Sequence, residues 1–197
     1  MYNCIFAPYC IRPSCDKSCP TLAETSYLLE RNRIDITNPV FRVEPEAADI
    51  ACRTLSSCEG QVVTWVSPGN PEGTADVFTY CAICQNWRGS RLHCVVYHLN
   101  FAQYIELIKS SWSTSAKSEE LEYMDIWIKT SKVLIISGFR YMRFNDFECQ
   151  TMLGLLDARR VKQQTTVVVS PSISSLVGNS TDFLPKLKSV LGRAVVE

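Results

Sequence analysis

The chain has 197 residues, of which 46% are hydrophobic and 20% are charged. These values indicate one principal globular domain with a sizeable core, and the sequence contains no internal repeat or low-complexity tract. Twenty basic and twenty acidic residues cancel to a formal net charge of zero, which argues against a general coat on DNA or on an anionic membrane.

The location of the protein is inferred from the apolar runs and the cysteines. No apolar run is long enough to cross a bilayer, and the first residues lack the basic region and long apolar region of a signal peptide. We therefore expect a cytoplasmic protein without a membrane contact. In that compartment, ten cysteines indicate metal ligands or buried thiols in preference to disulfides.

Four of these cysteines lie within the first twenty residues. They are Cys4, Cys10, Cys15 and Cys19, with the spacing C-x5-C-x4-C-x3-C and with Pro20 after them. Four thiolates in a short segment can meet the tetrahedral preference of zinc, and metal binding would supply its folding energy. This predicts a small zinc knuckle. A closing C-x3-C-P also occurs in iron–sulfur proteins, so a cluster is an alternative, as is a segment without metal.

Two helices are predicted after the knuckle, over residues 22–31 and 46–57. Thr21 and Glu24 have the spacing of a capping box, and Pro45 starts the second helix. Cys52 and Cys58 are isolated in sequence and are interpreted as apolar fillers. We divide the chain into a cysteine-rich metal knuckle (1–20), a helical connecting segment (21–58) and an α/β domain (59–197).

The α/β domain begins with an apolar strand, Val62–Val66, a Pro- and Gly-rich loop over 67–75, and a helix over 75–87. Strand, glycine-rich loop and helix in this order are the skeleton of a phosphate-binding P-loop. Cys81 and Cys84 lie on the apolar stripe of the helix. We therefore interpret them as core thiols and not as a redox or zinc pair.

The chemistry of a P-loop is missing from this loop. The pattern G-x-x-x-x-G-K-[S/T] needs a Lys for the phosphates and a hydroxyl for Mg²⁺. With Gly73 as the second glycine, Pro68 stands at the first glycine, followed by Gly69. Thr74 and Ala75 then stand at the Lys and hydroxyl positions.

The rest of the chain alternates between strands and helices. A central strand is predicted over 92–97, and Asn100 is expected to cap a helix over 101–111. A helix over 119–129 and a strand over 132–136, which ends in Ser137 and Gly138, come next. The remaining elements are helix 145–161, strand 165–169 before Pro171, helices 173–177 and 183–190, and strand 193–196. Five apolar strands separated by helices predict a three-layer α/β domain with a parallel sheet and right-handed crossovers.

From about residue 42 onward this pattern resembles the AAA+ domain of bacterial replicative helicase loaders of the DnaC/DnaI type. The resemblance rests on the strand and loop 62–75, the strand, Asn and helix of 95–108, the strand of 133–138, and segment 155–171. It implies an AAA+/RecA-like P-loop fold. Loaders of this family often carry an N-terminal cysteine-rich metal module that engages the helicase, and the four N-terminal cysteines stand where such a module would be.

The departures from the family pattern imply an inactive member. Thr74 and Ala75 replace the Walker A Lys and Thr, and Ser137 and Gly138 replace the Walker B acids that bind Mg²⁺ and orient water. Pro171 replaces a polar residue, usually Asn, after the fourth strand. We therefore expect a pseudo-ATPase that does not bind ATP. Asp76 and Asp146 are the candidates that could rescue a metal site.

Three arginines stand where this family can place side chains that reach a neighbouring nucleotide: Arg159, Arg160 and Arg193. Beside an active paralogue, one of them could stabilise transition-state charge in trans. The alternative is an ordinary solvated or salt-bridged surface arginine.

The favoured function is an interaction or scaffold subunit in DNA replication. It would bind a replicative helicase or an active AAA+ paralogue, within homo- or hetero-oligomers. One alternative is a nucleotide-binding or weakly active ATPase loader, which the missing Lys and the carboxylate of Glu72 in the loop disfavour. Another is an iron–sulfur protein for redox sensing or electron transfer.

A single-stranded DNA surface is a further possibility near the strand ends. Lys132, Arg140 and Arg143 are interleaved with Tyr141 and Phe144, and basic and aromatic side chains together suit single strands. The alternative is an exposed loop that covers the degenerate site.

Overall fold

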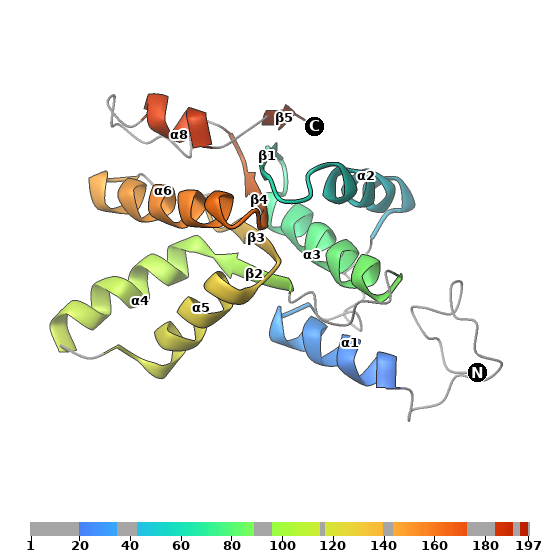
Figure 1. The fold of residues 1–197 in the computed structure, drawn as a ribbon, viewed down its shortest axis with the longest axis horizontal. Helices are drawn as coiled ribbons and strands as arrows, with labels where there is room; N and C mark the ends of the chain where they lie inside the picture. Colours follow the sequence, from blue (N-terminus) through green and yellow to red (C-terminus); the bar gives the residue numbers. More distant parts are fainter. Residues whose placement is uncertain are drawn as a thin grey trace.

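The computed structural model describes residues 20–34, 43–88, 96–114, 117–139, 144–172, 184–190 and 194–196 (Figure 1). The strands are β1 (Val62–Val66), β2 (Val96–Asn100), β3 (Val133–Ser137), β4 (Thr165–Ser170) and β5 (Ala194–Val196). The helices are α1 (Pro20–Arg31), α2 (Pro45–Ser57), α3 (Pro71–Arg88), α4 (Phe101–Thr114), α5 (Glu119–Thr130), α6 (Asp146–Val161) and α8 (Leu184–Val190).

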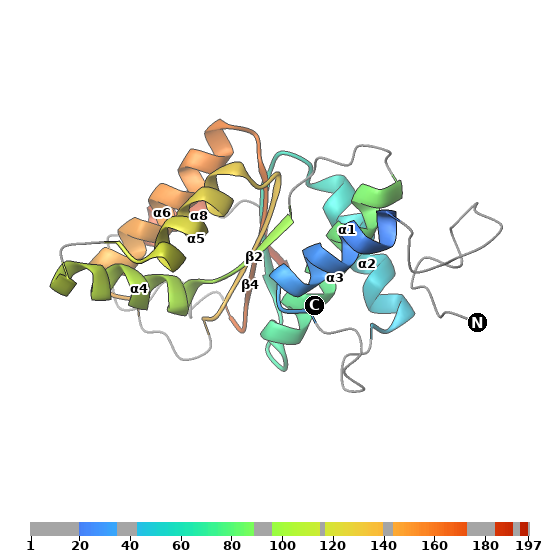
Figure 2. The same ribbon diagram turned by 90° about the horizontal axis from the view of Figure 1, so that it is seen from below.

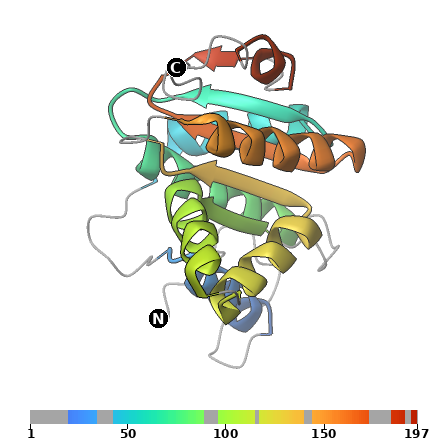
Figure 3. The same cartoon turned by 90° about the vertical axis from the view of Figure 1, so that its left-hand side faces the viewer.

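The strands form one five-stranded sheet in the order β2-β3-β4-β1-β5 (Figure 3). Every neighbouring pair is parallel, with Val62 opposite Thr166 in β1 and β4, and Leu134 opposite Thr166 in β3 and β4. Because all carboxyl ends lie at one edge of a parallel sheet, the segments that follow β1, β2 and β3 meet there. That edge carries the residues that the resemblance aligned with Walker A and Walker B.

Helices cover both faces of the sheet, as the three-layer prediction requires (Figure 2). Helices α4, α5 and α6 enclose one core with Leu134 and Ile136 of β3, and α1, α2 and α3 enclose the other with Ile135. Alternate residues of β3 therefore enter opposite cores, as its pleat demands. No helix in the described part of the chain is long and apolar enough to cross a membrane.

The helices α1 and α2 belong to the same core as the sheet. Leu29 of α1 and Leu55 of α2 are buried in the cluster that contains Phe78 and Cys81 of α3. Burial also raises the pKa of Cys58 to about 11, so this thiol stays protonated at neutral pH. The interpretation of Cys58 and Cys81 as core thiols is confirmed, whereas Cys52 and Cys84 are half-buried.

The strand predicted over 92–97 differs most from the structure. Strand β2 runs over Val96–Asn100, and residues 91–95 lie outside the described part. The expectation of a central strand was wrong, because β2 forms an edge of the sheet. Strand β2 is apolar although it lies at an edge, because helices cover both faces of the sheet there: Val96 lies in one core, and Tyr97 and Leu99 lie in the other. Helix 173–177 also lies outside the described residues.

A left-handed residue ends α6. Gln163 has φ of +51°, its amide bonds to the carbonyl of Arg160, and the amide of Gln164 bonds to the carbonyl of Arg159. This is a Schellman cap, whose left-handed position favours glycine. The exposed Gln163 side chain therefore adds backbone strain at this position.

We expect Gln163→Gly to raise the free energy of unfolding by about 1 kcal/mol, since it relieves the positive φ. Urea unfolding of the full chain measures the change. Lys162, with φ of −83°, is the matched control, and Lys162→Gly should be neutral or destabilising. Equal effects at the two positions would contradict the strain explanation.

Candidate functional site

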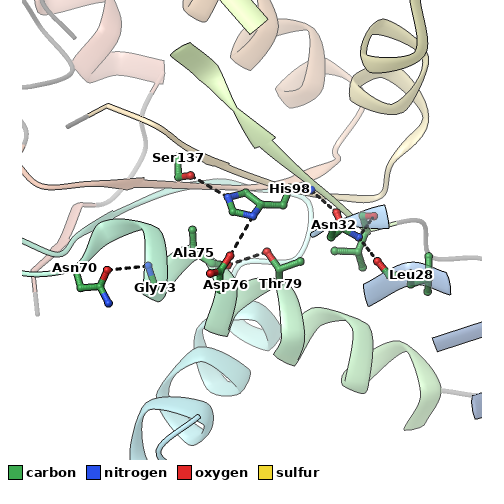
Figure 4. A network of polar contacts seen from close by, with 10 residues as sticks. Leu28, Asn32, Asn70, Gly73, Ala75, Asp76, Thr79, His98 and Ser137 are labelled. Atoms are coloured by element: carbon green, nitrogen blue, oxygen red, sulfur yellow. Dashed lines mark hydrogen bonds and ion pairs between the residues drawn. The ribbon is translucent and has the colours of Figure 1, made fainter. Parts of the chain in front are cut away.

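The candidate site lies at the carboxyl ends of β1, β2 and β3, beside the first turn of α3 (Figure 4). Pro68 and Gly69 are exposed in the short connection between β1 and α3. The amide of Ser67 donates to the carbonyl of Ser170 at 2.8 Å, which joins this connection to the end of β4 next to the half-buried Pro171.

The connection is shorter than the sequence predicted. Helix α3 begins at Pro71, so Glu72, Gly73 and Thr74 lie in its first turn and not in a loop. The side chain of Asn70 caps the helix, because its Oδ1 accepts from the amide of Gly73 at 3.0 Å. The triplet Asn-Pro-Glu carried this signal, since Asn is a preferred N-cap and Pro and acidic residues favour the first turn.

This cap occupies the place that a phosphate would need. A Cβ at Gly73 would lie 2.2 Å from Nδ2 of Asn70, so the amide side chain lies directly on the helix end. The Thr74 hydroxyl lies 2.9 Å from the hydroxyl of Ser67, and Ala75 is fully buried in the core. An anion at this helix end would therefore have to displace the cap of Asn70.

Replacement of Asn70 by Ala should lower the free energy of unfolding by about 1 kcal/mol, because the amide of Gly73 loses its acceptor. Thermal or urea unfolding measures this. The control is Asn70→Asp, which keeps the acceptor and adds a negative charge near the positive end of the helix dipole. If Asn70→Asp is as destabilising as Asn70→Ala, the hydrogen bond is not what stabilises the turn.

A histidine joins three elements at the centre of the site. Nδ1 of His98, on β2, lies 3.4 Å from Oδ1 of Asp76 in α3, and Nε2 lies 2.9 Å from Oγ of Ser137 on β3 (Figure 4). The carboxylate of Asp76 can only accept, so Nδ1 of His98 is the donor of this pair, and in the tautomer with its proton on Nδ1 the ring accepts from the Ser137 hydroxyl at Nε2. The order of groups is that of a charge-relay triad. However, only 2% of Ser137 is exposed, so this hydroxyl holds the ring and is closed to a substrate.

Nothing in the amino-acid sequence singles out His98. The predicted strand ended at Tyr97, and a single histidine carries little signal without its neighbours in space. Its role follows from the register of β2 and β3, which places His98 opposite Ile135. Asp76, the candidate for a rescued metal site, contacts this ring, while the other candidate, Asp146, lies exposed at the start of α6.

Gly138 has no room for the acidic side chain of the family pattern. Its φ is +89°, and a Cβ there would lie 2.4 Å from Oδ1 of Asn100. That oxygen accepts from the amide of Gln103 at 3.1 Å, which confirms the predicted cap on α4. The space beside β3 is therefore occupied by a helix cap.

Comparisons by sequence find no relative: no protein-family model matches, and no curated protein matches. Two solved structures share the fold. The DnaC helicase loader aligns with a TM-score of 0.52 and 16% identity, over 86% of this chain and 98% of its own. AMPPCP-bound DnaA from Aquifex aeolicus aligns with a TM-score of 0.52 and 11% identity, over 82% of this chain and 51% of its own.

This chain shares the parallel α/β fold of these two structures. The sheet order and the covering helices agree with the α/β architecture that the resemblance implied. At these identities the comparison establishes the fold alone. The residues that the resemblance aligned with Walker A and Walker B lie at the start of α3 and at the end of β3.

Arg159 was predicted as an arginine that could reach a neighbouring subunit, and the structure instead buries it. Only 2% of its surface is exposed, and its guanidinium donates to the carbonyls of Ile128, Ser131 and Thr165 and to the hydroxyl of Thr166. Burial lowers its pKa to about 10, so it stays charged at neutral pH. Neither the in-trans role nor the surface alternative fits this residue.

The other two arginines differ from Arg159. Arg160 is exposed and pairs with Asp157 at 2.7 Å. Arg193 lies outside the described residues. Arg160 is therefore exposed, as a contact with a neighbouring subunit would require. Its pair with Asp157 equally fits the alternative, a salt-bridged surface arginine.

Phe144 is the one aromatic residue of the predicted DNA surface that lies in the described part of the chain, and its ring is buried. Phe144 is 4% exposed and packs against Phe101 and Phe139, with ring centroids 5.6 Å and 5.9 Å apart. Its ring therefore cannot stack on a base. Lys132 is exposed, and the remaining members, Arg140, Tyr141 and Arg143, lie outside the described residues.

The predicted zinc ligands also lie outside the described residues: Cys4, Cys10, Cys15 and Cys19. Within the part that the structure describes, no group of three or more His, Cys, Asp or Glu side chains is arranged to hold a metal ion. The zinc and iron–sulfur alternatives for the N-terminal segment thus stay predictions.

Proposed function

We propose that this protein is a pseudo-ATPase with an AAA+ fold that acts as an interaction or scaffold subunit in DNA replication. Its partner would be a replicative helicase or an active AAA+ paralogue. The similarity of the fold to a helicase loader supports the proposed role in DNA replication. The proposed loss of activity rests on one observation, namely that Asn70 caps the amide of Gly73 in the first turn of α3.

Several features of the site support the loss of nucleotide binding. The Walker A Lys and hydroxyl positions hold Thr74 and the buried Ala75, and neither can replace the Lys or bind Mg²⁺ from there. The first turn carries the carboxylate of Glu72, which repels phosphate. At the Walker B positions, Ser137 is engaged by His98, and Gly138 faces Asn100.

The first test is calorimetric titration of the full chain with Mg·ATP and Mg·ADP at physiological concentrations. We expect no saturable heat. The matched variant is Asn70→Gly, which removes the capping side chain without adding a Lys, and it should also bind nothing. Saturable binding to the unmodified chain would overturn the pseudo-ATPase proposal and favour a nucleotide-binding loader.

The second test is retention of purified replicative helicase by the immobilised full chain. We expect retention of the helicase or of an active AAA+ paralogue without nucleotide. A full-length variant with Ser at positions 4, 10, 15 and 19 tests whether the cysteine segment carries the contact. Loss of retention in that variant alone assigns the contact to the segment. No retention by either chain would remove the proposed partners.

Metal analysis and a visible spectrum on the same preparation test the proposed zinc knuckle. We expect about one zinc per chain, as a four-thiolate site would hold. Iron with acid-labile sulfide and a brown colour would replace zinc by a cluster and favour the redox alternative. A chain without bound metal would contradict both.

A further inference from the structure

Two side chains at the end of α1 cover the outer edge of β2. Nη2 of Arg31 donates to the carbonyl of Val96, and Asn32 lies beside it on the same edge. Strand β2 forms an edge of the sheet, and Asn32 bridges two of its backbone groups. Nδ2 of Asn32 lies 3.3 Å from the carbonyl oxygen of Val96, and Oδ1 accepts from the amide of His98 at 2.6 Å. A residue of an added parallel strand would make this same pair of bonds. Asn32, which is 3% exposed, thus takes the place of a neighbouring strand.

The turn that holds Asn32 is tightly defined. Nδ2 of Asn32 also donates to the carbonyl of Leu28 at 2.7 Å, so the amide group uses all its donors. The amide of Arg33 bonds to Glu30, the amide of Ile34 bonds to Leu29, and Arg33 has φ of +58°. These bonds form a Schellman cap whose last residue, Ile34, is buried in the core.

The same β2 residue that receives Asn32 also organises the candidate site. The backbone of His98 bonds to Asn32, and its ring contacts Asp76 of α3 and Ser137 of β3 (Figure 4). A continuous set of polar contacts therefore runs from α1, across the sheet edge, to the degenerate nucleotide site. Among the described strands β3 alone pairs with β2, so these side-chain contacts add to the few backbone bonds that hold β2 in place.

The contact between α1 and α5 leaves two buried hydrogen-bond donors unpaired within the described residues. The guanidinium of Arg31 lies over the ring of Trp127 in α5, with 3.9 Å between its Cζ and the ring centroid. Nε of Arg31 and Nε1 of Trp127 are buried, yet neither has a hydrogen-bond partner within the described residues. Each unpaired donor carries a desolvation cost without a bond in return, which offsets part of what the bond from Nη2 of Arg31 to the carbonyl of Val96 contributes to the seating of α1.

We propose that α1 is a releasable strap, whose seating on the β2 edge holds His98 between Asp76 and Ser137. Displacement of α1 by a partner would free the His98 amide and loosen the start of α3. We describe the start of α3 as a degenerate nucleotide site, and this description rests on the proposed function. The coupling itself rests only on the described contacts, so it can fail or hold independently of nucleotide binding.

The test uses the two histidines of the chain, His93 and His98, whose ring signals are separated by the variant His93→Gln. In the unmodified chain, at a pH that keeps the ring neutral, ring ¹⁵N spectra should show the His98 tautomer with its proton on Nδ1. In Asn32→Ala, the ring signals should move toward those of a solvated histidine. The His98 amide should exchange with solvent at least about tenfold faster, because it loses its acceptor.

Two controls separate the strap from general loosening. The amide of Leu99 points to the opposite side of β2 from that of His98, toward β3, and its exchange should change little in Asn32→Ala. Arg33→Ala removes an exposed side chain of the same turn, which contacts Gln103 and Glu120, and it should leave the His98 ring signals unchanged. If Asn32→Ala does not fold, Asn32→Asp keeps the acceptor for His98 and should give a smaller shift in the same direction.

Coupling also has to be reciprocal. Ser137→Ala removes the hydrogen bond to His98 and should speed amide exchange at Ile34, in the cap of α1, more than it speeds exchange in α6. Faster exchange at both ends supports the strap. Unchanged His98 ring signals in the Asn32 variant, or unchanged α1 exchange in Ser137→Ala, would overturn it, whatever the outcome of the ATP titration.

Discussion

Replacing Arg159 by Met should lower the free energy of unfolding by about 4 kcal/mol. The guanidinium bonds to the carbonyls of Ile128, Ser131 and Thr165, at 2.8, 3.0 and 2.8 Å. Met has a similar length but no donor, so these buried carbonyls lose their partners, at about 1–3 kcal/mol each before relaxation. Arg159 joins the ends of α5 and α6 to the start of β4, and no other side chain in the described residues bonds to all three.

Urea unfolding with an unchanged m-value measures the loss. Arg160→Met, one residue further along α6, is the matched control, because Arg160 is exposed and its surface ion pair contributes about 0–1 kcal/mol. Arg159→Lys should fall between the two, since one ammonium cannot reach carbonyls that lie in several directions. Similar losses at positions 159 and 160 would show that the buried contacts do not carry the stability.

The second large effect is expected at Gly138. Gly138→Ala should cost about 3 kcal/mol, because it adds the strain of a side chain at φ of +89° to a contact of 2.4 Å with Oδ1 of Asn100. Asn100 would have to move, and its cap on Gln103 would be lost as well. An acidic residue at this position should be tolerated even less, so a Walker B acid cannot be restored here by one substitution.

A double-mutant cycle separates the two causes. In an Asn100→Ala background the side-chain contact is absent, and Gly138→Ala should then cost only the backbone strain. We expect a coupling energy of at least about 1 kcal/mol between the two positions. Additive losses would mean that the strain alone limits position 138.

Much of the architecture could be predicted from the sequence, because apolar runs and caps are local signals. Strand β1 has the predicted bounds, strand β4 is one residue longer than predicted, and strand β3 is shifted by one residue at both ends. Asn100 and Asn145 both begin helices, and Asn145 forms a capping box with Glu148. Helix α3 was placed too late because Asn70-Pro71-Glu72 was assigned to a P-loop, although the triplet is itself a helix start.

The amino-acid sequence by itself determined the α/β class, the alternation of strands and helices, and the residue types missing at the Walker positions. Those features depend on neighbours a few residues apart, so a single chain displays them. Only the tertiary structure decided that β2 is an edge strand, that Arg159 is buried, and that His98 meets Asp76 and Ser137. These outcomes depend on the order of strands in the sheet, which brings distant residues together and leaves little local trace.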